Sequence, residues 1–245
     1  MIKLSVNVNK VATLRNSRGG SVPSVLEAVR ICCEAGVAGI TVHPRADARH
    51  VTADDVRDIA RELSALKGRV EYNIEGDPRL DLLRLVREVK PDQCTLVPVR
   101  PGELTSQAGW STDTPRDALV EVIRELKDAG IRVSLFVDPE DAPIAWAADC
   151  GADRVELYTE PFARAFERGG EAARRSFAGY KRAAELAASL RLGVNAGHDL
   201  DLHNLVLFRT LPSLDEVSIG HALISRALFV GLARSVREYL DVLSV

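Results

Sequence analysis

The chain has 245 residues, of which 46% are hydrophobic and 27% are charged, so it can bury a full core and is not typical of a disordered protein. Its 32 basic and 35 acidic residues give a net charge of -3, which provides no electrostatic footprint for nucleic acid or for an anionic membrane surface. The length permits two small domains, but it suits one α/β barrel of about 250 residues, and we expect a single domain over residues 1–245.

Short runs of apolar and β-branched residues predict eight strands, at 4–8, 39–42, 70–74, 93–97, 132–137, 154–157, 193–195 and 216–219. Amphipathic patterns between them predict helices at 22–35, 53–66, 78–89, 115–129, 139–150, 172–190, 203–210 and 225–243. Apolar strands that alternate with helices indicate a parallel sheet covered by helices. Eight such units close a (β/α)₈ TIM barrel. A doubly wound open sheet is the alternative, but no GxGxxG motif follows the first strand.

The cysteines and the connecting segments narrow the class of protein further. The four cysteines show no CxxC spacing, and Cys32 and Cys33 are adjacent in a predicted helix, so we expect reduced thiols and no zinc site. The chain starts directly with a strand pattern, and no apolar run reaches about 18 residues, so we expect a cytoplasmic protein. Two connections, 98–114 and 158–170, are long enough to be binding loops.

Polar side chains gather at the predicted strand ends, where α/β barrels carry their reactive groups. Of the five histidines, four lie at or just beyond such ends: His43, His50, His198 and His221. We expect acid/base roles for His43 and His198, because imidazole exchanges protons near neutral pH. Glu75 ends a largely apolar strand, where burial raises a carboxyl pKa toward the same range. His203 lies on a predicted helix and is expected to be structural or on the surface.

Glycines after the last two predicted strands indicate a phosphate site. Gly197 and Gly220 let the backbone approach an anion in the region where barrels often bind phosphate. The cationic donors on the opposite side of the ring are Arg18, Arg45 and His50. This arrangement suggests two anionic groups in one pocket, whereas Arg15 and Arg49 are more typical of solvated surface charges. No cluster has metal-ligand spacing, so we expect no metal, and the residues alone leave the reaction open.

Seven short segments fall in order on separate predicted strand ends. They are 6–16 (VNVNKVATLRN), 39–45 (GITVHPR), 73–76 (NIEG), 95–98 (TLVP), 132–138 (RVSLFVD), 194–198 (VNAGH) and 219–222 (IGHA). Together they resemble the pyridoxine 5'-phosphate synthase family of vitamin B6 biosynthesis, and the resemblance spans nearly the whole chain.

The resemblance implies condensation of 3-amino-2-oxopropyl phosphate with 1-deoxy-D-xylulose 5-phosphate, without a cofactor, to give pyridoxine 5'-phosphate, inorganic phosphate and water. It implies that His43 and Glu75 accept protons, that His198 donates one, and that Glu156 stabilises a transition state. The implied substrate contacts are Asn7, Arg18, Arg45, His50, Thr105, Asp199, Gly220 and His221. Thr105 lies in the long loop that closes over the site in this family. Family members are homo-octamers built from dimers through extra helices.

Two departures from the family pattern concern the site. Many members have Asp-His where this chain has Asn9-Lys10, so we leave both residues out of the predicted site. Many have glycine where this chain has Asp199, which places an acid beside an expected phosphate, although the backbone amide can still bind the anion. Two other functions stay open. A strand-end Schiff-base lysine, for which Lys10 is the candidate, would support a phosphosugar aldolase or isomerase, and the other alternative is a non-catalytic barrel that binds phosphometabolites.

Overall fold

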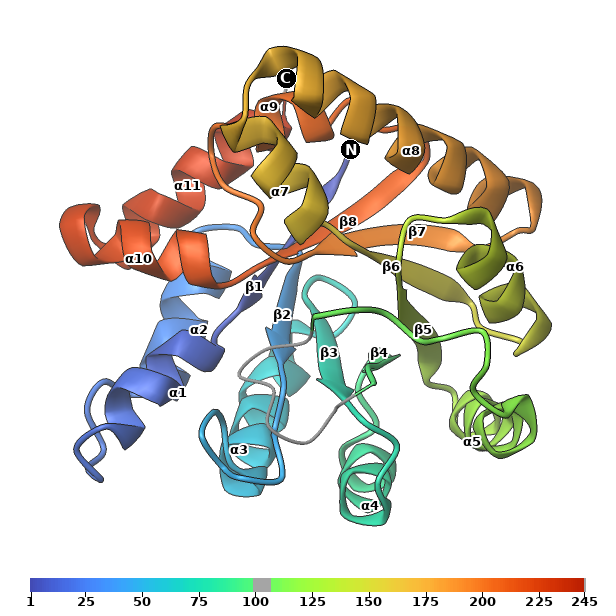
Figure 1. The fold of residues 1–245 in the computed structure, drawn as a ribbon. Coiled ribbons are helices and arrows are strands. Elements are labelled where there is room, and N and C mark those ends of the chain that lie inside the picture. The colour runs from blue at the N-terminus through green and yellow to red at the C-terminus, as the bar shows by residue number, and fades with distance from the viewer. Residues whose placement is uncertain (99–106, 245) are drawn as a thin grey trace.

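The computed structural model describes residues 1–98 and 107–244, which form a closed barrel of eight parallel strands in sequential order (Figure 1). Each strand pairs with the next, and β8 pairs with β1 to close the ring. The strands are β1 (Lys3–Asn7), β2 (Gly39–Val42), β3 (Glu71–Gly76), β4 (Gln93–Leu96), β5 (Arg132–Val137), β6 (Arg154–Tyr158), β7 (Gly193–Gly197) and β8 (Leu214–Ile219). The predicted TIM barrel is confirmed.

The helices lie outside the ring of strands (Figure 1). They are α1 (Asn9–Asn16), α2 (Val25–Glu34), α3 (Ala53–Leu63), α4 (Leu80–Val89), α5 (Arg116–Asp128), α6 (Asp141–Asp149), α7 (Glu160–Glu167), α8 (Gly170–Ser189), α9 (Leu205–Phe208), α10 (His221–Val230) and α11 (Leu232–Leu243), with a 3₁₀ turn, η1 (Ser64–Leu66), after α3. Every predicted strand agrees with an observed one to within two residues at each end.

Three helical regions differ from the prediction. The single helix predicted at 225–243 is two helices, α10 and α11, because Gly231 adopts a φ of 84° between them. The stretch 158–170, predicted as a long loop, contains α7, which has Pro161 in its first turn and an i,i+4 ion pair of Arg164 along its surface. No pattern predicts α1, because this short helix follows β1 almost directly and has no side-chain cap.

Apolar residues on the outward faces of the strands pack beneath the helices. Val6 and Ile40 are completely buried there. An aromatic cluster within this core joins α7, α8 and α9, with the rings of Phe162 and Phe208 5.1 Å apart and those of Tyr180 and Phe208 5.4 Å apart. The Tyr180 hydroxyl also donates a hydrogen bond to the backbone carbonyl of Tyr158 at 2.6 Å. This cluster therefore attaches the long helix α8 to the end of β6, where the barrel opens.

The inward faces of the strands are polar, whereas TIM barrels usually fill this space with Val, Ile and Leu. Ser5 Oγ and Thr41 Oγ1 lie 2.7 Å apart, and Asn73 Nδ2 donates to Thr41 Oγ1 at 3.3 Å. Thr95 Oγ1 in turn donates to Asn73 Oδ1 at 3.0 Å. Buried polar groups are stable only when they are hydrogen-bonded, so this network ties β1, β2, β3 and β4 to one relative register.

Replacing Phe208 by alanine should lower the free energy of unfolding by about 3–5 kcal/mol, because it removes a completely buried ring from the aromatic cluster. Val206→Ala is the matched control, since Val206 lies on the same helix but is 52% exposed, and it should change that free energy by less than about 0.5 kcal/mol. Urea unfolding followed by circular dichroism measures both values. Equal losses in the two variants would contradict this packing.

Candidate active site

A cavity of about 400 Å³ opens at the C-terminal ends of the strands, the face on which α/β barrels carry their catalytic groups. Its size suits a small-molecule ligand. Its polar and glycine lining residues are Asn7, Asn9, Lys10, His43, Arg45, His50, Glu75, Glu156, Arg164, His198, Asp199, Ser218, Gly220 and His221. The structure thus brings ten of the twelve predicted site residues around one space.

His43 and Glu75 lie side by side in the wall of the cavity, with 3.8 Å between the imidazole Nδ1 and the carboxyl Oε2. Two amide side chains hold them from β1 and α1. Asn7 Nδ2 donates to Glu75 Oε2 at 3.4 Å, and Asn9 Oδ1 accepts a hydrogen bond from the backbone N–H of His43 at 2.9 Å. The buried Nε2 atom of His43 has no hydrogen-bond partner among the described residues, so it is available to a ligand.

Burial shifts both members of this pair toward their uncharged forms. It lowers the pKa of His43 to about 3, and nearby positive groups, His50 first, act in the same direction. Burial raises the pKa of Glu75 well above its usual range, and repulsion from Glu156 and Glu216 adds to the effect. At neutral pH the imidazole can therefore accept a proton while the carboxyl beside it carries one.

Glu156 lies deeper in the barrel, where it is 4% exposed. A glycine on the neighbouring strand makes room for it, because a Cβ atom at Gly197 would lie 2.2 Å from Glu156 Oε1. Burial raises the pKa of Glu156, and repulsion from Glu216 adds to this shift. The carboxyl group therefore reaches the cavity from below in a position that a larger residue at 197 would block.

His198 and Asp199 follow β7 with φ values of 87° and 56°, a backbone conformation that is uncommon for residues other than glycine and that costs energy. The hydroxyl of Thr159 supports this turn, since it donates to the carbonyl of Gly197 at 2.8 Å and also to that of His198. The His198 ring packs edge-on against Tyr158, with centroids 5.2 Å apart. A hydrogen bond from His198 lowers the pKa of Asp199, so this acid is ionised and paired inside the cavity.

Two parts of the wall are suited to anions. Gly220 and His221 stand at the N-terminus of α10, where unpaired backbone N–H groups and the helix dipole favour negative charge. Arg45 and His50 line the cavity after β2. Burial lowers the pKa of His50 to about 4, and the positive charge of Lys10 acts in the same direction, so His50 is a neutral hydrogen-bonding group beside a charged guanidinium.

Two predicted site residues are not among those lining the cavity. Arg18 is exposed and lies outside it, and Thr105 lies outside the described residues. Arg15 does not line the cavity either. It is not the solvated surface charge expected from the sequence, because it binds Asp55 through hydrogen bonds of 2.6 and 2.8 Å and only 13% of its side chain is exposed. Arg49 pairs with a neighbouring aspartate.

In residues 1–98 and 107–244, no cluster of three or more His, Cys, Asp or Glu side chains could hold a metal ion.

Comparison with known protein families assigns this chain to one family. Residues 4–245 match the family described as pyridoxal phosphate biosynthesis protein PdxJ. The chain belongs to the PdxJ family. A pyridoxine 5'-phosphate synthase of Christiangramia forsetii is 52% identical to this PdxJ chain over 244 residues, covering 99% of this chain and 100% of that protein. One of Porphyromonas gingivalis is 49% identical over 246 residues and covers 100% of both chains.

Solved structures with the same fold include phosphoribosyl anthranilate isomerase of Thermotoga maritima, with a TM-score of 0.64 and 13% identity over 100% of the PdxJ chain and 99% of that chain. KGPDC from Streptococcus mutans gives a TM-score of 0.63 and 12% identity, over 100% and 98% of the two chains. At such identities the likeness concerns the barrel fold alone.

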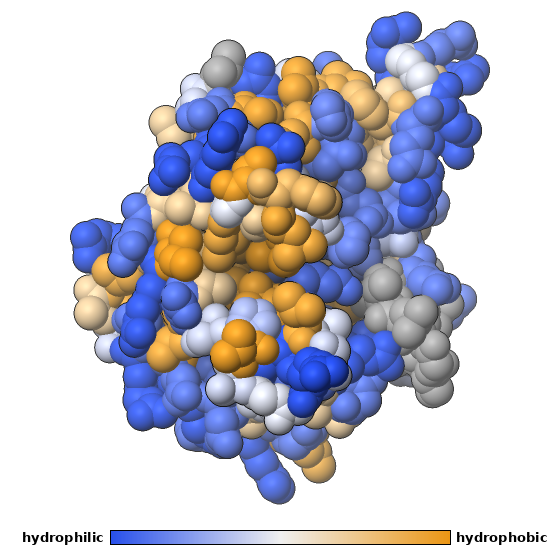
Figure 2. All heavy atoms as spheres, turned by 90° about the vertical axis from the view of Figure 1, so that its left-hand side faces the viewer, coloured by the Kyte–Doolittle hydropathy of each residue, from blue (hydrophilic) through white to orange (hydrophobic). Residues whose placement is uncertain are grey.

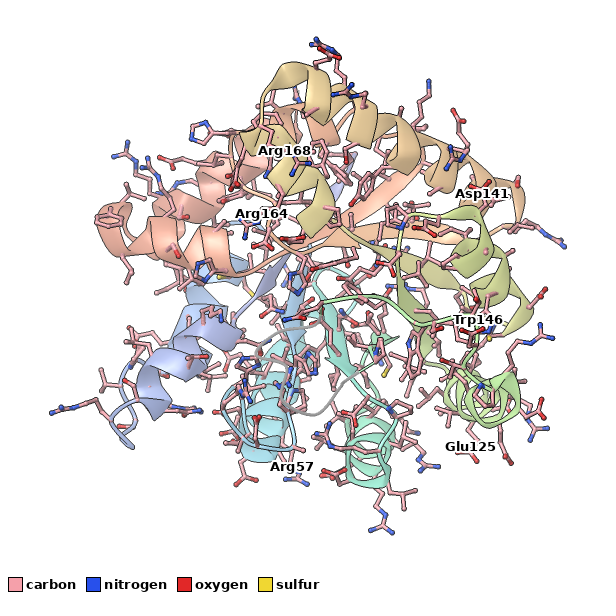
Figure 3. The ribbon with its side chains drawn as sticks, in the orientation of Figure 1. Arg57, Glu125, Asp141, Trp146, Arg164 and Arg168 are labelled. Carbon is pink, nitrogen blue, oxygen red and sulfur yellow. The ribbon has the colours of Figure 1, made fainter. Side chains whose placement is uncertain are left out.

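Four polar cavity residues of this chain are absent from the site predicted from sequence: Asn9, Lys10, Arg164 and Ser218. Asn9 and Lys10 are the first two residues of α1, and Asn9 Oδ1 accepts a hydrogen bond from the backbone N–H of His43. Arg164 belongs to α7, where Figure 3 labels it, and this segment is a loop in the prediction. The spacing of Glu160 and Arg164, which form an i,i+4 ion pair at 2.9 Å, is the signal that could have identified the helix and its cation.

The imidazole of His43 should stay uncharged between about pH 5 and about pH 8, because a pKa lowered to about 3 means that the ring loses its proton well below this range. ¹⁵N NMR of histidine-labelled PdxJ chain measures this, with the signal assigned by its loss in His43→Gln. A His43 signal that converts to imidazolium between pH values of about 7 and about 6 would show that burial does not control this group.

Proposed function

We propose that this chain is a pyridoxine 5'-phosphate synthase. It would join 3-amino-2-oxopropyl phosphate to 1-deoxy-D-xylulose 5-phosphate and release inorganic phosphate and water as the pyridine ring closes, a reaction that needs no cofactor. Relatives of this name, 52% and 49% identical over nearly all of both chains, support the proposal. The observation that carries it is the placement of His43 beside Glu75 in the cavity wall, where burial shifts the pKa of each group toward its uncharged form.

Ring closure needs several proton transfers at neighbouring carbon and oxygen atoms. The amine and the ketone form an imine, phosphate is eliminated, and an aldol-type closure and a dehydration follow. His43 takes a proton from the substrate, since its ring is neutral at physiological pH. Glu75 begins protonated, so it accepts a proton only after it has passed its own to a neighbour. His198 donates a proton from the turn after β7, and Glu156 stabilises a transition state from below the cavity.

The proposed substrate contacts are Asn7, Arg18, Arg45, His50, Thr105, Asp199, Gly220 and His221. The N-terminus of α10 at Gly220 suits one phosphate, and the guanidinium of Arg45 suits the other. The hydrogen bond from His198 holds the carboxylate of Asp199, and the backbone N–H of Asp199 is the group that can bind a nearby phosphate. For Arg18 and Thr105 the support is the family resemblance alone.

We further propose assembly into a homo-octamer built from dimers, and a cytoplasmic location. Leu228 and Phe229 on α10 are 70% and 86% exposed, and apolar side chains gather on this face of the molecule (Figure 2). Exposed apolar surface of this kind supports contact with another protein surface. Among the described residues, none of the helices is long and apolar enough to cross a membrane.

Purified protein incubated with both substrates, without added metal or cofactor, should form pyridoxine 5'-phosphate and inorganic phosphate in equal amounts. His43→Ala should lower the rate by about 10²- to 10⁴-fold, because it removes a proton acceptor. His203→Ala is the matched control and should keep the rate, since His203 is exposed and does not line the cavity. Failure of folded wild-type protein to form product would overturn the proposal. Borohydride trapping of a substrate on Lys10 would instead favour a Schiff-base aldolase.

Gly197→Ala should lower kcat by about 10²-fold, because the added methyl group overlaps Glu156 Oε1 and displaces that carboxyl group. Steady-state kinetics with both substrates measures the loss. Gly179→Ala is the control, as no atom lies within 4 Å of a Cβ atom added at this helical glycine. Wild-type kcat in Gly197→Ala would mean that the position of Glu156 does not matter for turnover.

A further inference from the structure

The floor of the barrel, below the cavity, contains a compact set of charged side chains. Its described members are three cations and three carboxylates: Lys3, Arg132, Arg154, Glu71, Asp215 and Glu216. Glu71 forms ion pairs with both Lys3 and Arg132, and Arg154 Nη1 lies 3.9 Å from Asp215 Oδ2. Glu216 completes the set, is 3% exposed, and has no place in the reaction proposed above.

Strand register places Glu216 in one row with Glu156. Glu156 on β6 is opposite Asn195 on β7, and Asn195 is opposite Glu216 on β8. Asn195 Nδ2 donates to Glu216 Oε1 at 3.4 Å, while Asn195 Oδ1 accepts a hydrogen bond from Arg154 Nη1 at 2.8 Å. The amide of Asn195 therefore binds two floor groups, Glu216 and Arg154, and lies in register between Glu216 and the carboxyl that reaches the cavity.

The two acids of this row stand in different electrostatic surroundings. Burial raises the pKa of Glu216 to about 7 and Glu71 adds to the shift, but Arg154, Arg132 and Lys3 act against it. Burial also raises the pKa of Glu156, and there the charge of Glu216 adds to the shift. Lys3 lies opposite Glu216 in the register of β1 with β8, and Arg154 binds the same amide as Glu216, so cations stand beside Glu216 and a single proton on the pair is favoured on Glu156.

We propose that Glu216 is a positioning residue for the reaction: its carboxylate, held beneath the cavity by Asn195 and the floor cations, keeps Glu156 protonated. Glu156 then presents a neutral O–H group, which donates a hydrogen bond to a substrate oxygen that gains negative charge as its carbonyl carbon is attacked. The inference rests on the proposed function and adds to it a residue remote from the substrate. The other titratable or charged groups around this row are His43, Glu75, His198, Lys3, Glu71, Arg132, Arg154 and Asp215.

Glu216→Gln tests the inference, because glutamine keeps an oxygen for Asn195 and removes only the charge. The pKa of Glu156 should fall, so the alkaline limb of kcat/KM should move to lower pH by about one unit. On the alkaline side this shift lowers kcat/KM about tenfold. KM for both substrates and the plateau value of kcat/KM at lower pH stay nearly unchanged. An unshifted limb in folded Glu216→Gln protein would overturn the inference, whether or not the rate falls at every pH.

Two further variants separate this effect from other consequences of the change. Asp215→Asn removes the same charge from the floor, but Asp215 has 46% of its side chain exposed, so solvent screens it and the limb should stay in place. In a Glu156→Gln background the Glu216→Gln change should no longer move the limb. A shift that persists in that background would mean that Glu216 acts on another group, such as Glu75, and would overturn the role assigned to Glu156.

A measurement without substrate decides the same point independently. In protein labelled with ¹³C at the glutamate carboxyl carbons, the signal that disappears in Glu156→Gln should be that of a protonated acid at pH 7, and it should titrate at lower pH in Glu216→Gln. An ionised Glu156 in the wild-type protein at pH 7 would overturn the inference, even if Glu216→Gln does not fold. Absence of pyridoxine 5'-phosphate formation would instead count against the proposed function and leave this titration to decide the inference.

Discussion

Hydrogen bonding across the interior of the barrel is the constraint on which the rest of the structure depends. Inward-facing groups such as Ser5, Thr41 and Asn73 are cut off from bulk water, so they must bond to one another. A strand that slipped by one residue would turn its polar side chains toward the helices and its apolar ones inward. Only one register satisfies both faces, and that register also brings Asn7 of β1 to Glu75 of β3 at the open end.

The same interior controls the charge of the site. Burial favours the uncharged forms of His43, Glu75 and Glu156, so the cavity contains acids that have kept their protons and a base that lacks one. An aliphatic filling would supply the burial but would offer no groups with which to hydrogen-bond or exchange protons. A polar filling supplies both, and its charged floor extends the influence on the site to residues that no substrate touches.

The strands could be predicted from sequence because their β-branched runs are the residues that pack under the helices. His43 and Glu75 could be predicted because reactive groups of barrels stand at strand ends. Glu216 could not be found by that criterion, since it lies within β8, although the alternating polar residues of β3 indicate a polar interior. Arg164 was missed with its helix, and the break at Gly231 depends on a backbone angle that the amphipathic pattern of the flanking helices does not reveal.

The clearance between Gly197 and Glu156 has an evolutionary consequence. A β-carbon at position 197 would displace the glutamate carboxyl at position 156, so position 197 cannot change alone without moving that acid, whereas a shorter side chain at 156 makes no clash. A lineage could accept alanine at 197 only after the side chain at 156 had become shorter, and the return path would require the reverse order. We therefore expect the glycine at position 197 to be kept in every descendant that keeps the glutamate at position 156.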